Sequence, residues 1–284
     1  MISLIVCTRN RAPQLRGMLA VLLGTDFVQN DVEVVLVDSA STDDTPQVIA
    51  EFAARTGART VRLERPGLAL ARNAGIERSS GATLVFTDDD CYLAASYFGK
   101  LRANFDASRC QYGMGSVLLF DPGDDRRVSN YAIEARQELP PYSLLPAGAI
   151  HGANMFFLRA VFERAGVFDP RMGAGTPFPC EDIEMATRAS LAGFTGVQLP
   201  EPVVYHHHGR KAGSPEADET VRQYDFGRGA YYASLLSRGA PAAWDLWKAC
   251  TGPLVPPSDA RQLERLEREL DAAHQFLRHQ RERA

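Results

Sequence analysis

The sequence predicts an α/β protein with a mainly parallel central sheet flanked by helices and a helical C-terminal extension. Short apolar runs, typical of strands buried on both faces, alternate through the first half with segments whose apolar residues recur at helical spacing. This alternation is typical of parallel sheets with right-handed crossovers. With 284 residues, 45% of them hydrophobic, the chain is long enough for one large domain with a sizeable core.

The individual elements follow from the same patterns. In the first half, the strands are expected at 2–6, 32–37, 61–63 and 83–86, and the helices at 13–23, 45–54 and 68–76. In the second half, the strands are expected at 111–120, 151–158 and 203–208, and the helices at 159–165, 181–191 and 216–237. Residues 169–179 are rich in Gly and Pro, which predicts a mobile loop.

The last segment is expected to be one charged helix. It follows a run of helix-breaking residues at 251–257, and Ser258 or Asp259 would cap a helix that continues to about Arg283. Apolar residues recur in it at heptad spacing, at Leu263, Leu266, Leu270, Ala273 and Leu277. This spacing fits a helix packed on its own domain and a homodimer contact equally well.

Composition excludes several classes of protein. The formal net charge of −4 argues against nucleic-acid binding, and no apolar stretch is long enough for a membrane span. Arg9 and Arg11 interrupt the opening apolar run, so we expect no signal peptide. The five cysteines are scattered and form no CxxC, which disfavours a zinc site or a disulfide framework. We expect a cytoplasmic protein, with peripheral contact at the inner face of a membrane left open.

Polar clusters follow three of the predicted strands, at 8–10, 38–43 and 88–90. Ligands of open parallel sheets bind beyond the carboxyl ends of the strands, so these clusters should converge on one crevice. Three adjacent carboxylates at 88–90 repel each other by several kcal/mol unless a cation offsets them. Hard oxygen ligands suit Mg²⁺ or Mn²⁺ bound to a diphosphate, and a solvated acidic turn is the alternative.

Three further features are candidates with a simpler alternative each. Asp38 either closes a turn or binds a base or ribose. Glu181 and Asp182 either cap a helix or, beside a metal–diphosphate site, supply a general base. The histidines at 206–208 are either a polar strand end or place one imidazole on the same metal.

Four motifs together resemble inverting glycosyltransferases of family 2, which have the GT-A fold. Residues 2–11 (ISLIVCTRNR) resemble the family's first strand and nucleotide-contacting turn. Residues 35–45 (VLVDSASTDDT) are similar to its VDDGSTDGT segment. Residues 67–90, with Arg72-Asn73-Ala74-Gly75 and Asp88-Asp89-Asp90, resemble the stretch that ends in its DxD motif. Cys180-Glu181-Asp182 with Gly193-Phe194 resembles its ED motif, so the likeness covers residues 1–208.

The resemblance implies a role for each matching residue. Those implied to bind the donor nucleotide and sugar are Thr8, Asn10, Asp38, Arg72, Asp88, Asp89, Gly152 and Asn154. Those implied to hold the metal, Mn²⁺ or Mg²⁺, are Asp88, Asp90 and His206. Asp182 would be the catalytic base, and Glu181 its neighbour or a contact of the acceptor. The implied domains are a GT-A domain at 1–215, with a nucleotide half (1–110) and an acceptor half (111–215), and a helical extension at 216–284.

The expected function is metal-dependent transfer of one sugar from a nucleotide-diphosphate sugar, with UDP favoured, to an acceptor hydroxyl. The acceptor would be a saccharide, a lipid-linked saccharide or a natural product. The QxxRW motif of processive members is missing, because Gln223 is followed by Tyr-Asp-Phe. The turn after Asp38 also departs from the family pattern, reading Ser-Ala-Ser.

Two alternatives remain open at this stage. A sugar-1-phosphate nucleotidyltransferase would need a Gly-rich basic loop after the first strand, where this chain has Thr8-Arg9-Asn10-Arg11. A dehydrogenase is excluded, because it would need GxGxxG at the same place and the chain has none there. A non-catalytic nucleotide-sugar-binding protein would lack either the base or the metal set.

Overall fold

The computed structural model describes residues 1–251 and 260–281. One mixed sheet runs through it in the order β3-β2-β1-β4-β8-β6-β9-β5, with β7 paired to β9. The strands are β1 (Ile2–Thr8), β2 (Val32–Asp38), β3 (Arg59–Arg62), β4 (Thr83–Asp88), β5 (Cys91–Leu93), β6 (Tyr112–Leu119), β7 (Gln137–Leu139), β8 (Met155–Leu158) and β9 (Gly196–His206). The helices are α1 (Ala12–Leu22), α2 (Thr45–Thr56), α3 (Leu68–Arg78), α4 (Tyr97–Asn104), α5 (Arg159–Ala165), α6 (Glu181–Leu191), α7 (Pro215–Ser237), α8 (Ala242–Thr251) and α9 (Ala260–Arg281).

The first half of the sheet is parallel, which confirms the predicted α/β class. β1 pairs in parallel with β2 and β4, and β2 pairs in parallel with β3. The registers set Thr8 opposite Asp38, and Cys7 opposite Asp88. The carboxyl ends of β1, β2 and β4 therefore lie side by side, and their polar residues emerge at one edge of the sheet.

The second half of the sheet is mixed. β8 is antiparallel to β4 and β6, whereas β9 is parallel to β6 and antiparallel to β5 and β7. β9 is longer than the expected strand at 203–208, since it begins at Gly196 and ends at His206. Pro200 and Pro202 interrupt the apolar pattern of β9, so the part of the strand before residue 203 could not be predicted from the sequence.

Two other expectations need correction. Of the expected strand at 151–158, only the second half is β8; the first half contains a 3₁₀ turn at Gly152–Asn154. The strands β5 and β7 were not anticipated from the sequence, because three-residue strands carry no periodic signal. The helices α4 and α8 were also not anticipated.

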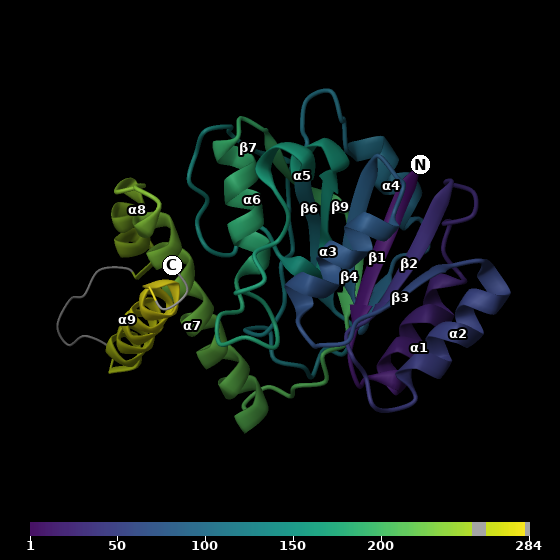
Figure 1. Ribbon diagram of the computed structural model, residues 1–284, viewed down its shortest axis with the longest axis horizontal. Coiled ribbons are helices and arrows are strands. Elements are labelled where there is room, and N and C mark those ends of the chain that lie inside the picture. Colours follow the sequence, from purple (N-terminus) through teal and green to yellow (C-terminus); the bar gives the residue numbers. More distant parts are fainter. Residues whose placement is uncertain (252–259, 282–284) are drawn as a thin grey trace.

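The C-terminal helices gather at one end of the molecule, and α1 and α2 lie at the other (Figure 1). α9 packs against α7 of its own chain, with its buried residues at Glu269, Ala272, Ala273 and Phe276. Leu263 and Leu270, two of the heptad residues, stay about half exposed. The expected cap at Ser258 or Asp259 and the helix end at Arg283 lie outside the described residues. Among those described, no helix combines the length and apolarity of a membrane span.

Candidate active site

A cleft of about 410 Å³ opens at the carboxyl edge of the parallel strands. Thr8 from the end of β1 lines it, as do Asp88, Asp89 and Asp90 from the end of β4 and His206 from the end of β9. The loop before α3 contributes Gly67, and residues 174–175 face it. Segments from both halves of the chain therefore meet in one crevice, as the sequence predicts.

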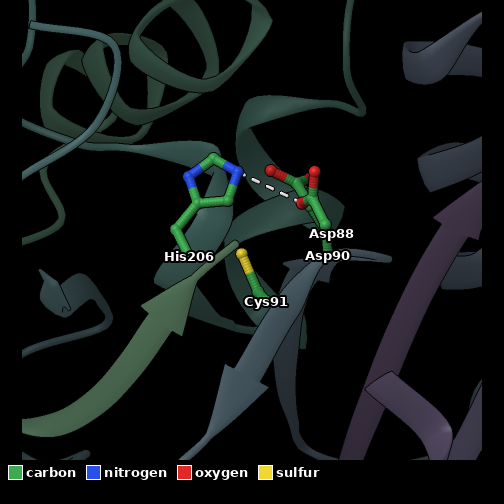
Figure 2. A group of neighbouring side chains, drawn as sticks. All are labelled: Asp88, Asp90, Cys91 and His206. Carbon is green, nitrogen blue, oxygen red and sulfur yellow. Dashed lines mark ion pairs between the residues drawn. The ribbon is translucent and has the colours of Figure 1, made fainter. Parts of the chain in front are cut away.

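The acidic triplet and His206 form a compact cluster with Cys91 (Figure 2). One ligand atom from each of Asp88, Asp90, Cys91 and His206 lies within 4.8 Å of the others. The antiparallel register that pairs Cys91 with His206 brings the histidine to the triplet, where its Nε2 lies 3.1 Å from Asp90 Oδ1. Two carboxylates and one imidazole suit Mn²⁺ or Mg²⁺, whereas the thiol of Cys91 is a soft ligand that does not.

Asp89, the middle carboxylate, points toward β1. Its Oδ2 accepts a hydrogen bond of 2.6 Å from Thr8 Oγ1, and its Oδ1 one of 2.7 Å from Arg11 Nε. Burial raises the pKa of Asp89 to about 6, although Arg11 opposes the shift. Arg11 also forms an ion pair with Asp90, so it offsets part of the charge of the triplet. Sequence reasoning gave Arg11 no role, although it stands in the first of the quoted motifs.

Arg72 joins the acidic cluster to the start of α6. Its side chain is buried and forms an ion pair with Glu181, and its Nη2 lies 3.7 Å from Asp88 Oδ1. Burial alone would lower the pKa of Arg72, yet these two carboxylates raise it above its ordinary value. A Cβ at Gly152 would lie only 2.7 Å from Arg72 Nη2, so any other residue there would force the guanidinium to shift.

Asp182 lines a second cavity of about 300 Å³. Its Oδ2 accepts a hydrogen bond of 2.8 Å from the amide of Gly152, and its Oδ1 one of 2.7 Å from the amide of Ile183. Burial raises the pKa of Asp182 above its ordinary value, against the lowering influence of Arg72. Glu181, by contrast, is held by Arg72 and does not line this cavity. Of the two acidic residues, only Asp182 faces the space that a second substrate could enter.

The second cavity has an aromatic lining beside Asp182. Tyr131, His151 and Tyr224 contribute to it together with Arg228, and Pro179 and Tyr224 are shared with the first cleft. Burial lowers the pKa of His151 to about 4, which keeps this imidazole neutral at pH 7. The two cavities therefore adjoin each other, with the acidic cluster in one and Asp182 in the other. Tyr224 and Arg228 come from α7 and had no motif to identify them.

Three other residues named from the sequence are not among those that line the cleft. Asn10 is exposed, and its Oδ1 accepts a hydrogen bond of 2.7 Å from the amide of Thr42, which ties together the loops after β1 and β2. Asp38 accepts one of 2.9 Å from the amide of Ser41. Its Oδ2 is buried and has no hydrogen-bond partner among the described residues, but it forms an ion pair of 3.6 Å with Arg62 Nε.

Asn154 is fully buried, and its amide is used inside the protein. Its Nδ2 donates to the carbonyls of Ser116 and Pro202, and its Oδ1 accepts from Tyr97. Asn154 therefore supports the fold, and we do not propose it as a contact of the donor.

The sequence matches the family model described as Glycosyl transferase family 2 over residues 3–166, more than half of the chain. The chain belongs to glycosyl transferase family 2. Among curated relatives of this family 2 glycosyltransferase is glycosyltransferase AglE of Haloferax volcanii, 23% identical over 239 residues, which are 84% of this chain and 75% of AglE.

Solved structures of glycosyltransferases share its GT-A fold. Mannosyltransferase PcManGT from Pyrobaculum calidifontis, in complex with GDP-Man and Mn²⁺, aligns with a TM-score of 0.56 and 20% identity, over 97% of this chain and 86% of that one. S. aureus TarS 1-349, in complex with UDP-GlcNAc, aligns with a TM-score of 0.57 and 17% identity, over 99% and 91% of the two chains. The alignment with a longer TarS structure covers 84% of this chain but only 43% of the TarS chain.

Proposed function

We propose that this glycosyltransferase moves one sugar from a nucleotide-diphosphate sugar to an acceptor hydroxyl, with inversion at the anomeric carbon and Asp182 as the general base. The observation that supports this most directly is the position of Asp182. It lines a cavity that adjoins the cleft of the acidic cluster, so an acceptor beside Asp182 and a donor beside Asp88 and Asp90 would meet at the shared boundary.

Asp182 is suited to remove a proton from the acceptor. Two backbone amides orient its carboxylate, and burial raises its pKa, which makes the carboxylate a stronger base than that of an exposed aspartate. The deprotonated acceptor oxygen attacks the anomeric carbon as the bond to the diphosphate breaks. A single displacement inverts that centre, so no covalent sugar intermediate is required.

The donor would lie along the cleft of 410 Å³. Thr8, Asp38 and Asp89 are the proposed contacts of the nucleotide, with Asn10 shaping the loop beside them. Asp88, Asp90 and His206 would hold Mn²⁺ or Mg²⁺, which when bound neutralises charge on the departing diphosphate. Among the described residues, three cationic side chains line the same cleft: Arg9, Arg11 and Arg210. Arg72 positions Asp88 and Glu181 from behind.

The nature of the donor follows by analogy. The TarS complex contains UDP-GlcNAc and the PcManGT complex contains GDP-Man with Mn²⁺, so both nucleotides occur in proteins of this fold. We favour UDP by analogy with the TarS complex. We favour single-sugar transfer because the QxxRW motif of processive members is missing. A thermal-shift screen of UDP-, GDP- and dTDP-sugars, with and without Mn²⁺, selects the donor, because a ligand that binds the folded state raises the melting temperature.

Asp182→Asn tests the proposal. With the selected donor and a panel of saccharides, prenyl-linked saccharides and glycosides, the variant should bind the donor as the wild type does. Its turnover should fall by about 10²- to 10⁴-fold, the range for loss of a general base. Asp245→Asn, on the exposed surface of α8, is the control and should change neither quantity. Normal turnover by Asp182→Asn would identify another group as the base.

A further inference from the structure

Residues 169–179, the loop that the sequence predicts to be mobile, form one wall of the donor cleft. Ala174, Gly175 and Pro179 line the cleft, and the carbonyl of Ala174 accepts a hydrogen bond of 3.1 Å from the amide of Leu68 at the start of α3. The residue before the loop, Phe168, is fastened to α3 as well. Its amide donates to Asn73 Oδ1 and its carbonyl accepts from Asn73 Nδ2, both at 2.9 Å.

The opposite side of this loop contacts α9, the C-terminal helix. Phe178 meets Phe276 edge to face, with ring centroids 5.4 Å apart, and the guanidinium of Arg171 lies 5.7 Å from the centroid of the Phe276 ring. The ring of His279, one turn farther along α9, has its centroid 6.0 Å from that of Phe178. Phe276 is almost completely buried, although it belongs to a helix with a largely charged surface.

Backbone hydrogen bonds within the loop connect the residues that contact α9 to those that line the donor cleft. The amide of Gly173 donates to the carbonyl of Phe178 at 2.9 Å, and the amide of Thr176 donates to the carbonyl of Gly173 at 3.0 Å. The residue that α9 contacts, Phe178, is therefore hydrogen-bonded across the loop to the residue before Ala174. A displacement of Phe178 would move the segment that lines the donor cleft.

We infer that α9 sets the shape of the donor cleft and that Phe276 is a positioning residue for donor binding. The inference rests on the proposed donor site. Phe276 contacts Phe178 and Arg171 on the side of the loop that faces α9, and this contact keeps Ala174 and Gly175 against the start of α3. α9 begins 81 residues after the end of this loop and lies outside the region 3–166 that matches the family model, yet it completes the wall of the nucleotide site.

Removal of the Phe276 ring should weaken donor binding through the loop. A cavity of about 230 Å³ already lies between the loop and α9, so a truncated side chain leaves Phe178 room to move. If the loop then occupies its donor-competent position about 10–30% of the time, the apparent Kd rises about three- to tenfold. A contribution of Phe276 to overall stability alone would leave the Kd of the folded protein unchanged.

Three variants test the inference: Phe276→Ala, Phe276→Leu and the control Leu270→Ala, which truncates a half-exposed residue of the same helix. Calorimetry measures the Kd of UDP and of GDP in the presence of Mn²⁺, and hydrogen exchange follows residues 169–179. Phe276→Ala should raise the Kd of the nucleotide that binds by about three- to tenfold and speed exchange in the loop. Phe276→Leu, which keeps an apolar contact with Phe178, should restore most of the affinity, and Leu270→Ala should match the wild type.

The outcomes separate the inference from the function on which it rests. Equal Kd values for Phe276→Ala and Leu270→Ala would overturn the inference and leave the donor site intact. Faster exchange spread over β1, β2 and α3, without a change in Kd, would assign Phe276 a structural role only and would also overturn it. Failure of the wild type to bind either nucleotide would overturn the proposed donor site and the inference together.

Discussion

Arg72→Met should destabilise the protein by an amount that depends on pH. The guanidinium is buried and neutralises Glu181, which is buried too. Without it, Glu181 would be an uncompensated buried charge and would take up a proton instead. The ordinary pKa of this carboxyl is 4.5, so protonation at pH 7 costs up to about 3 kcal/mol at 1.36 kcal/mol per pH unit. Burial already raises the pKa of Glu181 in the wild type, against the lowering influence of Arg72, so the difference between the two proteins is at most this amount. Asp88, about one third exposed, is solvated and adds less.

The sign of the pH dependence follows from linkage. In the variant, the folded protein holds a proton on Glu181 that the unfolded chain has lost above pH 4.5, so stability rises as the pH falls. The loss relative to the wild type should therefore shrink from at most about 3 kcal/mol at pH 7 to at most about 1.4 kcal/mol at pH 5.5. Urea denaturation of both proteins at the two pH values measures it.

Two further variants serve as controls for the Arg72 experiment. Arg72→Met combined with Glu181→Met removes both charges, so it should be less destabilised than Arg72→Met alone. Arg16→Met breaks an exposed pair with Glu51 and should cost less than about 1 kcal/mol at either pH. A loss for Arg72→Met that is the same at both pH values, or a double variant at least as unstable, would refute the reasoning.

Three other predictions concern the site. Asp90→Asn should weaken Mn²⁺ binding by about tenfold or more, because it removes a carboxylate ligand; calorimetry measures this, and an unchanged affinity would mean that the ion binds elsewhere. The kcat/KM of the wild type should fall on acidification through the pKa of Asp182, which burial raises above the ordinary 3.8, so a pH–rate profile whose acid limb lies at or below 3.8 would contradict its role. Asn154→Ala should cost about 2 kcal/mol or more in urea denaturation by leaving buried groups unpaired, with nucleotide affinity intact, whereas weaker nucleotide binding would return Asn154 to the donor site.

Much of the fold was predictable because burial leaves a direct trace in the sequence. β1, β2 and β4 are buried on both faces, so they read as continuous apolar runs, and the polar clusters that follow them mark the carboxyl edge of the sheet. The helices α1 and α2 were anticipated within a few residues, because their buried positions recur at helical spacing. The first part of β9 was not predicted, because its prolines interrupt the apolar pattern of the strand.

The site was predictable in part for the same reason. Asp88 and Asp90 follow a buried strand directly, so their place could be read from the chain. Glu181 and Asp182 are neighbours of the same charge, and nothing local distinguishes them. Arg72 selects between them: it pairs with Glu181, which leaves Asp182 to line the second cavity.

Local pattern in the chain is enough to establish the class of fold, the edge of the sheet that carries the polar residues, and the likeness to family 2. These properties depend on residues close together in sequence, and backbone periodicity reports them directly. The partner of each charged side chain is different, because it depends on segments that meet only after folding. Arg11 beside Asp89, Arg72 beside Glu181 and Phe276 beside Phe178 are contacts of this kind, and they result from the packing of the whole molecule.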